Sequence, residues 1–197
     1  RSSSSAASDV YKRQTLPCAA VTAWNALVTE GNLQPNDTVL VQGTGGVSIF
    51  ALQIAKAMGC RVIVTSSSNE KLEKVKTLGA DDVINYVENP DWDKTTLDLT
   101  NNNGVEHIIE VGGAKTFKKS LNCAAFSGQI SVIGVLSGLE SSISVIPILM
   151  KRLRVQGIYV GHRESFEAMV QFFEQYQIKP VISDTFTLEN TKQAFDS

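Results

Sequence analysis

Residues 38–48 read TVLVQGTGGVS, an apolar, β-branched run followed directly by a cluster of glycines. The run predicts a buried strand, and the residues from Gly46 onward predict a helix that begins at the glycine turn. Glycines let a backbone approach a diphosphate, whose charge is favoured by the N–H groups of a helix N-terminus. Ser48 stands where a third glycine usually packs the helix onto the strand, and serine is small enough for that position. We therefore predict a dinucleotide-binding unit, with an ordinary strand–turn–helix as the alternative.

The composition is typical of a globular protein of about one domain. The chain has 197 residues and a formal net charge of −2, which gives no indication of nucleic-acid binding. Its three cysteines, Cys18, Cys60 and Cys123, are far apart, which excludes a disulfide framework or a paired-cysteine metal knuckle and favours a reducing, cytoplasmic setting. No apolar run approaches membrane-spanning length, so we expect no membrane association.

Strand-like and helix-like segments alternate along the chain after residue 38. Strands are expected at residues 39–42, 61–65, 82–86, 107–111, 129–135 and 155–160. Helices are expected at residues 46–58, 69–78, 116–124, 146–152 and 164–175, with one more opening at Asp91 and a last one beginning near Leu188. Almost wholly apolar strands that alternate with helices imply a parallel sheet covered on both faces. We therefore predict an α/β fold with a doubly wound parallel sheet of the Rossmann type.

The residues after the second expected strand, about twenty positions beyond the glycine turn, decide which cofactor fits. A carboxylate there would bind the ribose hydroxyls and repel a 2′-phosphate, which selects NAD. This chain has Thr65-Ser66-Ser67-Ser68-Asn69-Glu70-Lys71, with no acid at the strand end. Hydroxyls of Ser66 and Ser67 and the ammonium of Lys71 would accept the extra phosphate, so we predict NADP(H) rather than NAD(H). The alternative is that Lys71 is merely solvated and the site does not discriminate.

Further motifs extend this interpretation to most of the chain. They are Leu16-Pro17-Cys18-Ala19-Ala20-Val21-Thr22-Ala23-Trp24, Gln53-Ile54-Ala55-Lys56-Ala57-Met58-Gly59, Leu78-Gly79-Ala80-Asp81 and Ile109-Glu110-Val111-Gly112-Gly113. Together with the glycine turn they resemble the medium-chain dehydrogenase/reductase superfamily, which holds the alcohol dehydrogenases and the quinone oxidoreductases. The resemblance implies an enzyme that moves hydride between a nicotinamide and a carbonyl, alcohol, activated alkene or quinone.

The resemblance also assigns cofactor contacts, residue by residue. They are Thr22, Gly43, Thr44, Gly45, Gly46, Val47, Ser66, Ser67, Lys71, Tyr86, Gly112, Ile133, Gly134, Ile158 and Val160. In this assignment Thr22 and the residues from Gly112 onward surround the nicotinamide, and Tyr86 lies on the adenosine side. Plain core packing is the alternative for Ile133 and Tyr159. No catalytic residue is nominated, and Glu110 is interpreted as structural.

The domain boundaries follow from composition and from the resemblance. Residues 1–14, RSSSSAASDVYKRQ, are interpreted as a non-native or disordered tail. Residues 15–37 are expected to form a linker and approach helix, and residues 38–197 the dinucleotide-binding domain. The superfamily's N-terminal substrate domain and its final strand have no counterpart here, so we expect a fragment that is inactive by itself.

The sequence favours the absence of a catalytic zinc over its presence. Cys18 matches one zinc ligand of the zinc-dependent members, but a catalytic zinc needs three protein ligands, and a small core-filling cysteine is the alternative. His107 and His162 are badly placed to complete such a site, and we assign no metal ligand. The rival functions are a zinc-dependent NAD(H) alcohol dehydrogenase and a dinucleotide-binding module without chemistry.

A second copy of the chain is the expected partner. The last predicted strand, residues 155–160, lies near the edge of the sheet, and an apolar edge tends to be covered. Relatives of this type pair there, which implies a homodimer.

Overall fold

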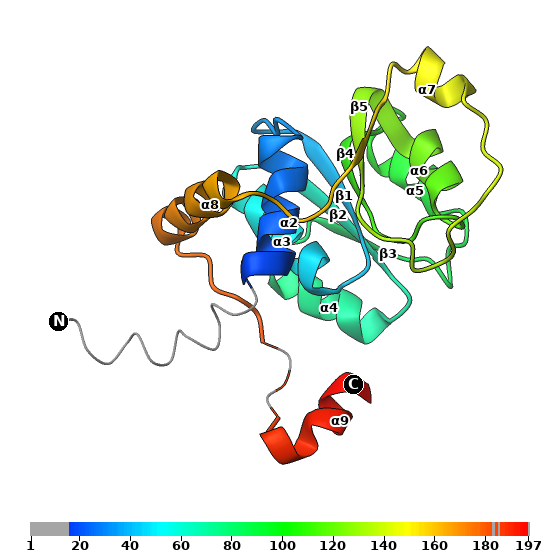
Figure 1. The fold of residues 1–197 in the computed structure, drawn as a ribbon. Helices are drawn as coiled ribbons and strands as arrows, with labels where there is room; N and C mark the ends of the chain where they lie inside the picture. The colour runs from blue at the N-terminus through cyan, green and yellow to red at the C-terminus, as the bar shows by residue number, and fades with distance from the viewer. Residues whose placement is uncertain (1–15, 183, 185, 197) are drawn as a thin grey trace.

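The structure, a computed structural model, describes residues 16–182, 184 and 186–196 (Figure 1). The tail predicted at residues 1–14 lies outside these ranges. The strands of the structure are β1 (Thr38–Gln42), β2 (Arg61–Ser66), β3 (Asp82–Asn85), β4 (Val105–Glu110), β5 (Ala124–Val132) and β6 (Arg154–Gly157). They form one parallel sheet in the order β3-β2-β1-β4-β5-β6. The predicted doubly wound sheet is confirmed, and the strand order reverses direction beside β1.

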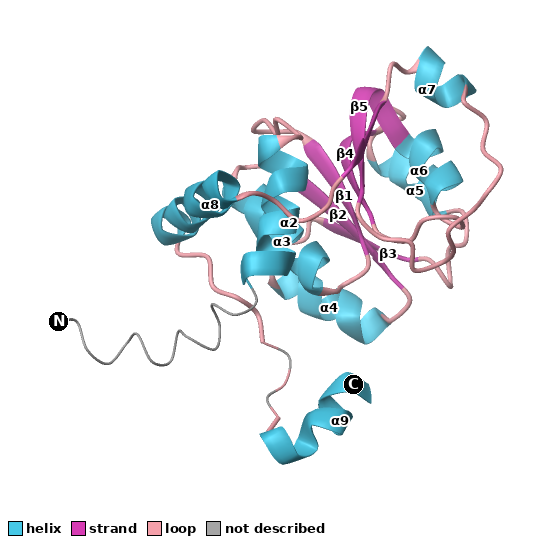
Figure 2. Cartoon of the chain, in the orientation of Figure 1, coloured by secondary structure: helices cyan, strands magenta, loops and turns pink. Residues whose placement is uncertain are grey.

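Helices cover both faces of the sheet (Figure 2). The N-terminal helical segment comprises η1 (Leu16–Ala20), α2 (Val21–Trp24) and η2 (Asn25–Thr29), and it is followed by α3 (Gly46–Ala57), α4 (Asn69–Thr77), α5 (Trp92–Leu99), α6 (Phe117–Cys123), α7 (Ile146–Met150), α8 (Arg163–Tyr176), η3 (Leu188–Asn190) and α9 (Thr191–Asp196). Among the helices of the described ranges, none combines the length and apolar character that crossing a bilayer requires.

The alternation of side chains along β1 builds two cores. Val39 and Val41 point to the face covered by α2, α3, α4 and α8, whereas Leu40 points to the face covered by α5, α6 and α7. Each of these three side chains has no exposed surface. Full burial on both faces explains the continuous apolar run that the sequence shows at this strand. The segment from η1 to η2 contributes buried residues to the first of these cores.

The largest differences from the predicted strand boundaries occur in the fifth and sixth strands, and the fifth also ends at Val132 rather than at residue 135. The fifth strand begins at Ala124 rather than at residue 129, because Ala124 pairs with Val105 ahead of an irregularity in the β4–β5 register. The sixth strand ends at Gly157 rather than at residue 160. Val160 has a φ of 58°, which is incompatible with an extended strand. The core-packing alternative for Tyr159 is also wrong, because its side chain is 96% exposed.

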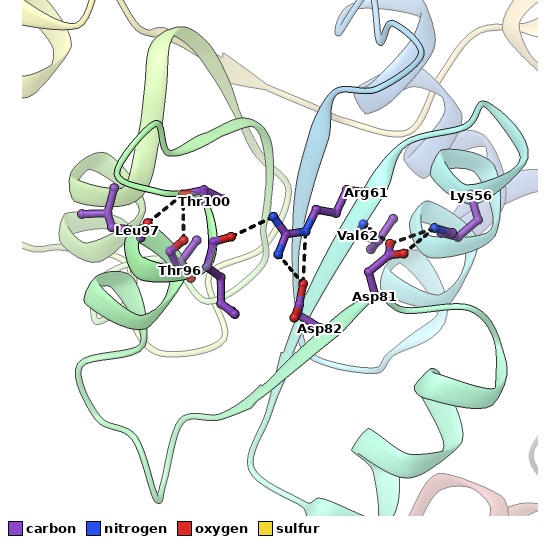
Figure 3. A network of polar contacts seen from close by, with 9 residues as sticks. Lys56, Arg61, Val62, Asp81, Asp82, Thr96, Leu97 and Thr100 are labelled. Carbon is purple, nitrogen blue, oxygen red and sulfur yellow. Dashed lines mark hydrogen bonds and ion pairs between the residues drawn. The ribbon is translucent and has the colours of Figure 1, made fainter.

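A polar network fixes the start of β2 and β3 (Figure 3). Arg61 donates to Asp82 Oδ2 from Nε at 3.1 Å and from its terminal nitrogen at 2.7 Å, and also to the carbonyl of Leu99 at 2.8 Å. Asp81 accepts from Lys56 Nζ at 2.8 and 2.9 Å and from the N–H of Val62 at 2.7 Å. The paired aspartates therefore tie the end of α3, the start of β2 and the end of α5 to the start of β3.

Candidate functional site

The glycine turn after β1 has the backbone conformation that a close ligand approach requires. Gly43 has a φ of 72°, and its N–H donates to the carbonyl of Thr65 at 2.7 Å, which joins the turn to β2. A Cβ atom added at Gly43 or at Gly45 would meet no other atom within 4 Å. The two glycines are thus not required by packing, and the space beside them is open. The left-handed φ demands glycine at Gly43, whereas Gly45 has an ordinary extended conformation.

The N-terminus of α3 begins directly at this turn. Gly45 occupies the N-cap position, and within the described residues no side chain caps the helix there. The N–H groups of Gly46 and Val47 and the helix dipole are therefore available for an anion. The Ser48 hydroxyl donates to the carbonyl of Gln42 at 2.8 Å and is buried, so serine suits this position as expected. These features fit the diphosphate of a dinucleotide.

Gly46 packs closely against the N-terminal helical segment. A Cβ atom at Gly46 would lie 3.3 Å from the Cβ of Ala19 in η1. The small residue at this position lets α3 lie against the N-terminal helical segment. The contact is formed by residues far apart in sequence, and the motif alone gave no signal for it.

The loop after β2 carries hydroxyl groups at the place where the adenosine ribose of a dinucleotide would lie. Ser66 ends β2 and is buried, while Ser67 and Lys71 are exposed. Ser68 is the N-cap of α4 and accepts the N–H of Lys71 at 3.3 Å. Tyr86 donates its N–H to the carbonyl of Ser66 at 3.1 Å, so the structure brings Tyr86 beside this loop. The segments that carry the Ser66 and Ser67 hydroxyls, Lys71 and Tyr86 are therefore neighbours in the structure.

Glu88 is a carboxylate beside the same loop that the sequence reasoning missed. Its Oε1 atom accepts from Asn69 Nδ2 at 2.6 Å and from Asn85 Nδ2 at 3.1 Å. Asn85 also donates to Asn69 Oδ1 at 2.7 Å. Asn69 opens α4 and Asn85 ends β3. The only available signal was the adjacency of β2 and β3, which brings the ends of both strands together.

Glu110 organises the turn after β4. It has no exposed surface, and its carboxylate accepts five hydrogen bonds. The N–H groups of Gly112 and Gly113 each donate at 2.9 Å, and Gln42 Nε2 donates at 2.8 Å. The hydroxyls of Thr116 and Ser120 complete the set. The structural interpretation of Glu110 thus has a physical basis, because a buried carboxylate requires such a shell of donors.

The residues assigned to the nicotinamide wall lie around the carboxyl ends of β4, β5 and β6. The N–H of Ile133 donates to the carbonyl of Glu110 at 2.8 Å, and that of Ile158 to the carbonyl of Val132 at 2.9 Å. A Cβ at Gly134 would lie 2.6 Å from the carbonyl of Val111, so only glycine fits. Ile133, Ile158 and Val160 all pack against the core that contains α2.

Thr22 and Cys18 interact with each other on the N-terminal helical segment. The Thr22 hydroxyl donates to the Cys18 carbonyl at 2.7 Å, and Thr22 is buried. Cys18 is exposed, so it is not the core-filling residue of the alternative interpretation. Within the described ranges, no three histidine, cysteine, aspartate or glutamate side chains are grouped as a metal site would need. The described residues therefore do not by themselves fit a catalytic zinc.

The other thiols and the histidines are engaged elsewhere. Burial raises the pKa of the Cys60 thiol to about 11 and that of the Cys123 thiol to about 12, so neither is a thiolate at neutral pH. His107 lies within β4 beside Asp37. His162 is the N-cap of α8 and accepts the N–H of Ser165 at 3.2 Å, the local role expected for it.

Comparison with known proteins gives a consistent match. The family model described as zinc-binding dehydrogenase matches residues 46–175. A zinc-type alcohol dehydrogenase-like protein of Schizosaccharomyces pombe is 46% identical over 188 residues, covering 92% of this chain and 54% of that protein. A quinone oxidoreductase-like protein 2 homolog of Nematostella vectensis is 31% identical, covering 88% of this chain and 50% of its own length.

The fold comparison agrees. A crystal structure of a protein from Sinorhizobium meliloti superposes with a TM-score of 0.89 at 48% identity, covering 94% of this chain and 54% of that one. The chain spans about half the length of the curated relatives it matches.

Proposed function

The chain belongs to the zinc-binding dehydrogenase family of the medium-chain dehydrogenase/reductase superfamily, whose members are NAD(P)-dependent oxidoreductases, and we propose that it binds NADP(H). In the whole protein the cofactor would exchange hydride with a carbonyl or alcohol, or with an activated alkene or quinone. The observation that carries this proposal is the open, uncapped N-terminus of α3 at the glycine turn. It is the element that a diphosphate requires.

The nicotinamide would supply or take up the hydride, and this chain would supply orientation. The N–H groups of Gly46 and Val47 would hold the diphosphate at the open end of α3. Glu110 fixes the Gly112–Gly113 turn at the carboxyl end of β4, which shapes the wall where the nicotinamide ring would lie. Ile133 and Ile158 give that region an apolar surface that excludes water.

The preference for NADP(H) is supported by the residues of the loop after β2, residues 66–71, where the adenosine ribose would lie. The end of β2 carries the Ser66 and Ser67 hydroxyls and no acid, and Lys71 is exposed in the first turn of α4. These groups complement a 2′-phosphate, which accepts several hydrogen bonds and carries negative charge. Tyr86 is bonded to this loop through its backbone N–H and is exposed, so its ring would be available on the adenosine side.

NAD(H) remains the second candidate because of Glu88. Its carboxylate lies in the same Asn69–Asn85 cluster beside the loop and would repel a 2′-phosphate. The Glu88 charge would therefore weaken the binding of NADP(H), which carries a 2′-phosphate, but not that of NAD(H), which has none. A direct comparison of NADPH and NADH binding to the chain decides between them.

A glycine substitution tests the cofactor site without disturbing the fold. Because Gly45 has no positive φ and open space at its Cβ, Gly45→Ala is expected to leave the melting temperature unchanged. The added methyl group would occupy the approach of the diphosphate and lower affinity for both cofactors at least about tenfold, which is ~1.4 kcal/mol. Fluorescence titration with NADPH and NADH measures this. Lys118→Gln, at an exposed position on α6, is the control and should bind both cofactors normally.

Catalysis is tested on the full-length protein. Oxidation of NADPH in the presence of a quinone, an enal or a ketone would support the oxidoreductase and identify the substrate class. Cofactor binding without turnover on any of them would favour a dinucleotide-binding module without chemistry.

We also propose that two copies of the chain pair along β6. This strand ends the sheet order, and most of its residues are exposed. Apolar side chains on and near it also face solvent, among them Val155 at 41%, Leu149 at 75% and Met150 at 68% exposure. An apolar sheet edge is a surface that proteins generally cover. Sedimentation velocity over a range of protein concentrations measures the association.

A further inference from the structure

Two loops contact each other beyond the carboxyl ends of β4 and β5. The β4 loop comprises residues 111–116, between β4 and α6, and the β5 loop comprises residues 133–138, directly after β5. The sheet reverses its order between β1 and β4, and ligands of doubly wound sheets bind outside the carboxyl ends of the strands at this point. The glycine turn and the loop after β2 belong to the half of the sheet that would hold the adenosine. The β4 and β5 loops belong to the other half, where the nicotinamide would lie.

The main chains of the two loops lie in direct contact. A Cβ atom added at Gly113 would lie 2.9 Å from the carbonyl oxygen of Gly138. One added at Gly134 would lie 2.6 Å from the carbonyl oxygen of Val111. The N–H of Ala114 donates to the Gly138 carbonyl at 3.1 Å. Because glycine restricts the backbone least of all residues, loops that meet through glycines need a further contact to hold a single conformation.

The side chain of Ser137 supplies such a contact. Its hydroxyl donates to the carbonyl of Gly112 at 2.7 Å and accepts the N–H of Lys115 at 2.9 Å. The Ser137 N–H donates to the same Gly112 carbonyl at 2.7 Å. Ser137 is half-buried. One hydroxyl of the β5 loop therefore binds both the early and the late part of the β4 loop.

Glu110 and Ser137 hold the β4 loop through different backbone groups. The buried Glu110 carboxylate accepts the N–H groups of Gly112 and Gly113. Ser137 instead binds the Gly112 carbonyl and the Lys115 N–H. Loss of the Ser137 hydroxyl would leave the Glu110 contacts in place. We therefore expect the chain to stay folded without this hydroxyl, while the β4 and β5 loops move more freely against each other.

From these contacts we infer that Ser137 is a positioning residue for the nicotinamide half of the cofactor, an inference that rests on the proposed function. Ser137 acts through the β4 and β5 loops and not by touching the cofactor. A ligand that binds to loops already held in one conformation loses less binding free energy to their ordering. The adenosine half would bind at the glycine turn and the loop after β2, so its binding does not depend on Ser137.

Ser137→Ala tests the inference with whole cofactors and with their adenosine halves. NADPH and NADH contain the nicotinamide, whereas 2′,5′-ADP and ADP do not. In isothermal titration the variant should bind the preferred dinucleotide about three- to tenfold more weakly than the unmodified chain does, as expected for the loss of one hydrogen-bonding group. The matching adenosine fragment should bind equally well to both proteins. Ser137→Thr keeps the hydroxyl and should bind the dinucleotide normally, as should the control Ser142→Ala, at an exposed position farther along the chain.

The results distinguish this inference from the proposed function. An equal loss of affinity for dinucleotide and fragment in Ser137→Ala would mean a general structural role, and unchanged dinucleotide binding would mean that the hydroxyl has no influence on the site. Either result overturns the inference and leaves the proposed function standing. If the unmodified chain binds neither NADPH nor NADH, the proposed function fails and the inference fails with it.

Amide hydrogen exchange gives a second measurement, which needs only the unmodified chain. The preferred dinucleotide should slow exchange in the β4 and β5 loops, including the Lys115 N–H that Ser137 binds, whereas the adenosine fragment should not. Slowing of the Lys115 N–H by both ligands alike, or by neither, would contradict the inference even if Ser137→Ala does not fold.

Discussion

The side chains of Gln42 and Glu110 meet inside the molecule, where Gln42 Nε2 donates to Glu110 Oε2 at 2.8 Å. Both residues are buried, and they end the neighbouring strands β1 and β4. The Gln42 amide also donates to the Ser120 hydroxyl at 2.8 Å. The strand that leads into the glycine turn and the turn that shapes the nicotinamide wall are thus joined by one carboxylate.

Glu110→Gln should destabilise the chain by about 2 kcal/mol. The amide group of the new side chain would face the Gln42 amide, so two donors would meet where a donor and an acceptor now pair. The free energy of unfolding in urea measures the loss. Gln42→Glu combined with Glu110→Gln restores a donor–acceptor pair and should recover part of it. A single variant as stable as the unmodified chain would show that the turn is held by other contacts.

Glu88→Gln should increase NADPH affinity by roughly two- to tenfold while leaving NADH affinity nearly unchanged. The substitution keeps an oxygen that can accept from Asn69 and Asn85, but it removes the negative charge beside the proposed 2′-phosphate position. Lys71→Gln is the matched opposite and should weaken NADPH selectively. Isothermal titration of both cofactors provides the four affinities. Equal changes for the two cofactors would mean that Glu88 is remote from the ribose.

The fold could be predicted where the signal is local. The run before Gly43 and the apolar stripe after it specify β1 and α3 within a few residues, because strand, turn and helix are contiguous in sequence. The start of β5 could not be predicted, since Ala124 joins the sheet only through its pairing with Val105. The early end of β6 depends on the left-handed backbone at Val160, for which a β-branched residue gives no signal.

The candidate site also combines features that local sequence predicts with features that depend on tertiary structure. The glycine turn could be predicted because Gly43 needs a positive φ, and this requirement lies within the motif itself. The donors around Glu110 come from β1, the following turn and α6, so the role of this residue depends on tertiary structure. Glu88 escaped notice for the same reason. Its partners are set by strand order and register, which no local pattern contains.

Val155→Lys should shift the chain toward the monomer. Val155 lies on the outer strand and is 41% exposed, and a lysine there would bring two like charges together across a pair of β6 strands. Sedimentation velocity measures the weight-average mass of the variant and the unmodified chain at several concentrations. Lys118→Gln on α6 is a suitable control and should not change association. If Val155→Lys and Lys118→Gln associate equally, the contact between the two copies does not lie at Val155.

The Lys56–Asp81 pair should make stability depend on pH at acid values. Burial of Asp81 acts to raise its pKa, but the hydrogen bonds from Lys56 Nζ and the Val62 N–H outweigh this, and the pKa is lowered overall. A lowered carboxyl pKa in the folded state contributes stability that is present above the unfolded-state pKa and is lost as the pH falls through the folded-state value. Both side chains are about one-third exposed, at 30% and 38%, so the contribution should stay below about 1 kcal/mol.

Asp81→Asn and Lys56→Met separate the charge effect from the backbone contact. At pH 7 Asp81→Asn should be less stable than the unmodified chain, and the difference should shrink as the pH is lowered and Asp81 becomes protonated in the folded protein. Lys56→Met keeps the Asp81 acceptor for Val62 but should move the Asp81 pKa back toward its ordinary value. Urea unfolding across the acid range and carbon-detected titration of the Asp81 carboxyl measure the two effects. If the difference in unfolding free energy between Asp81→Asn and the unmodified chain does not change with pH, the charge of the Asp81 carboxylate contributes nothing to stability.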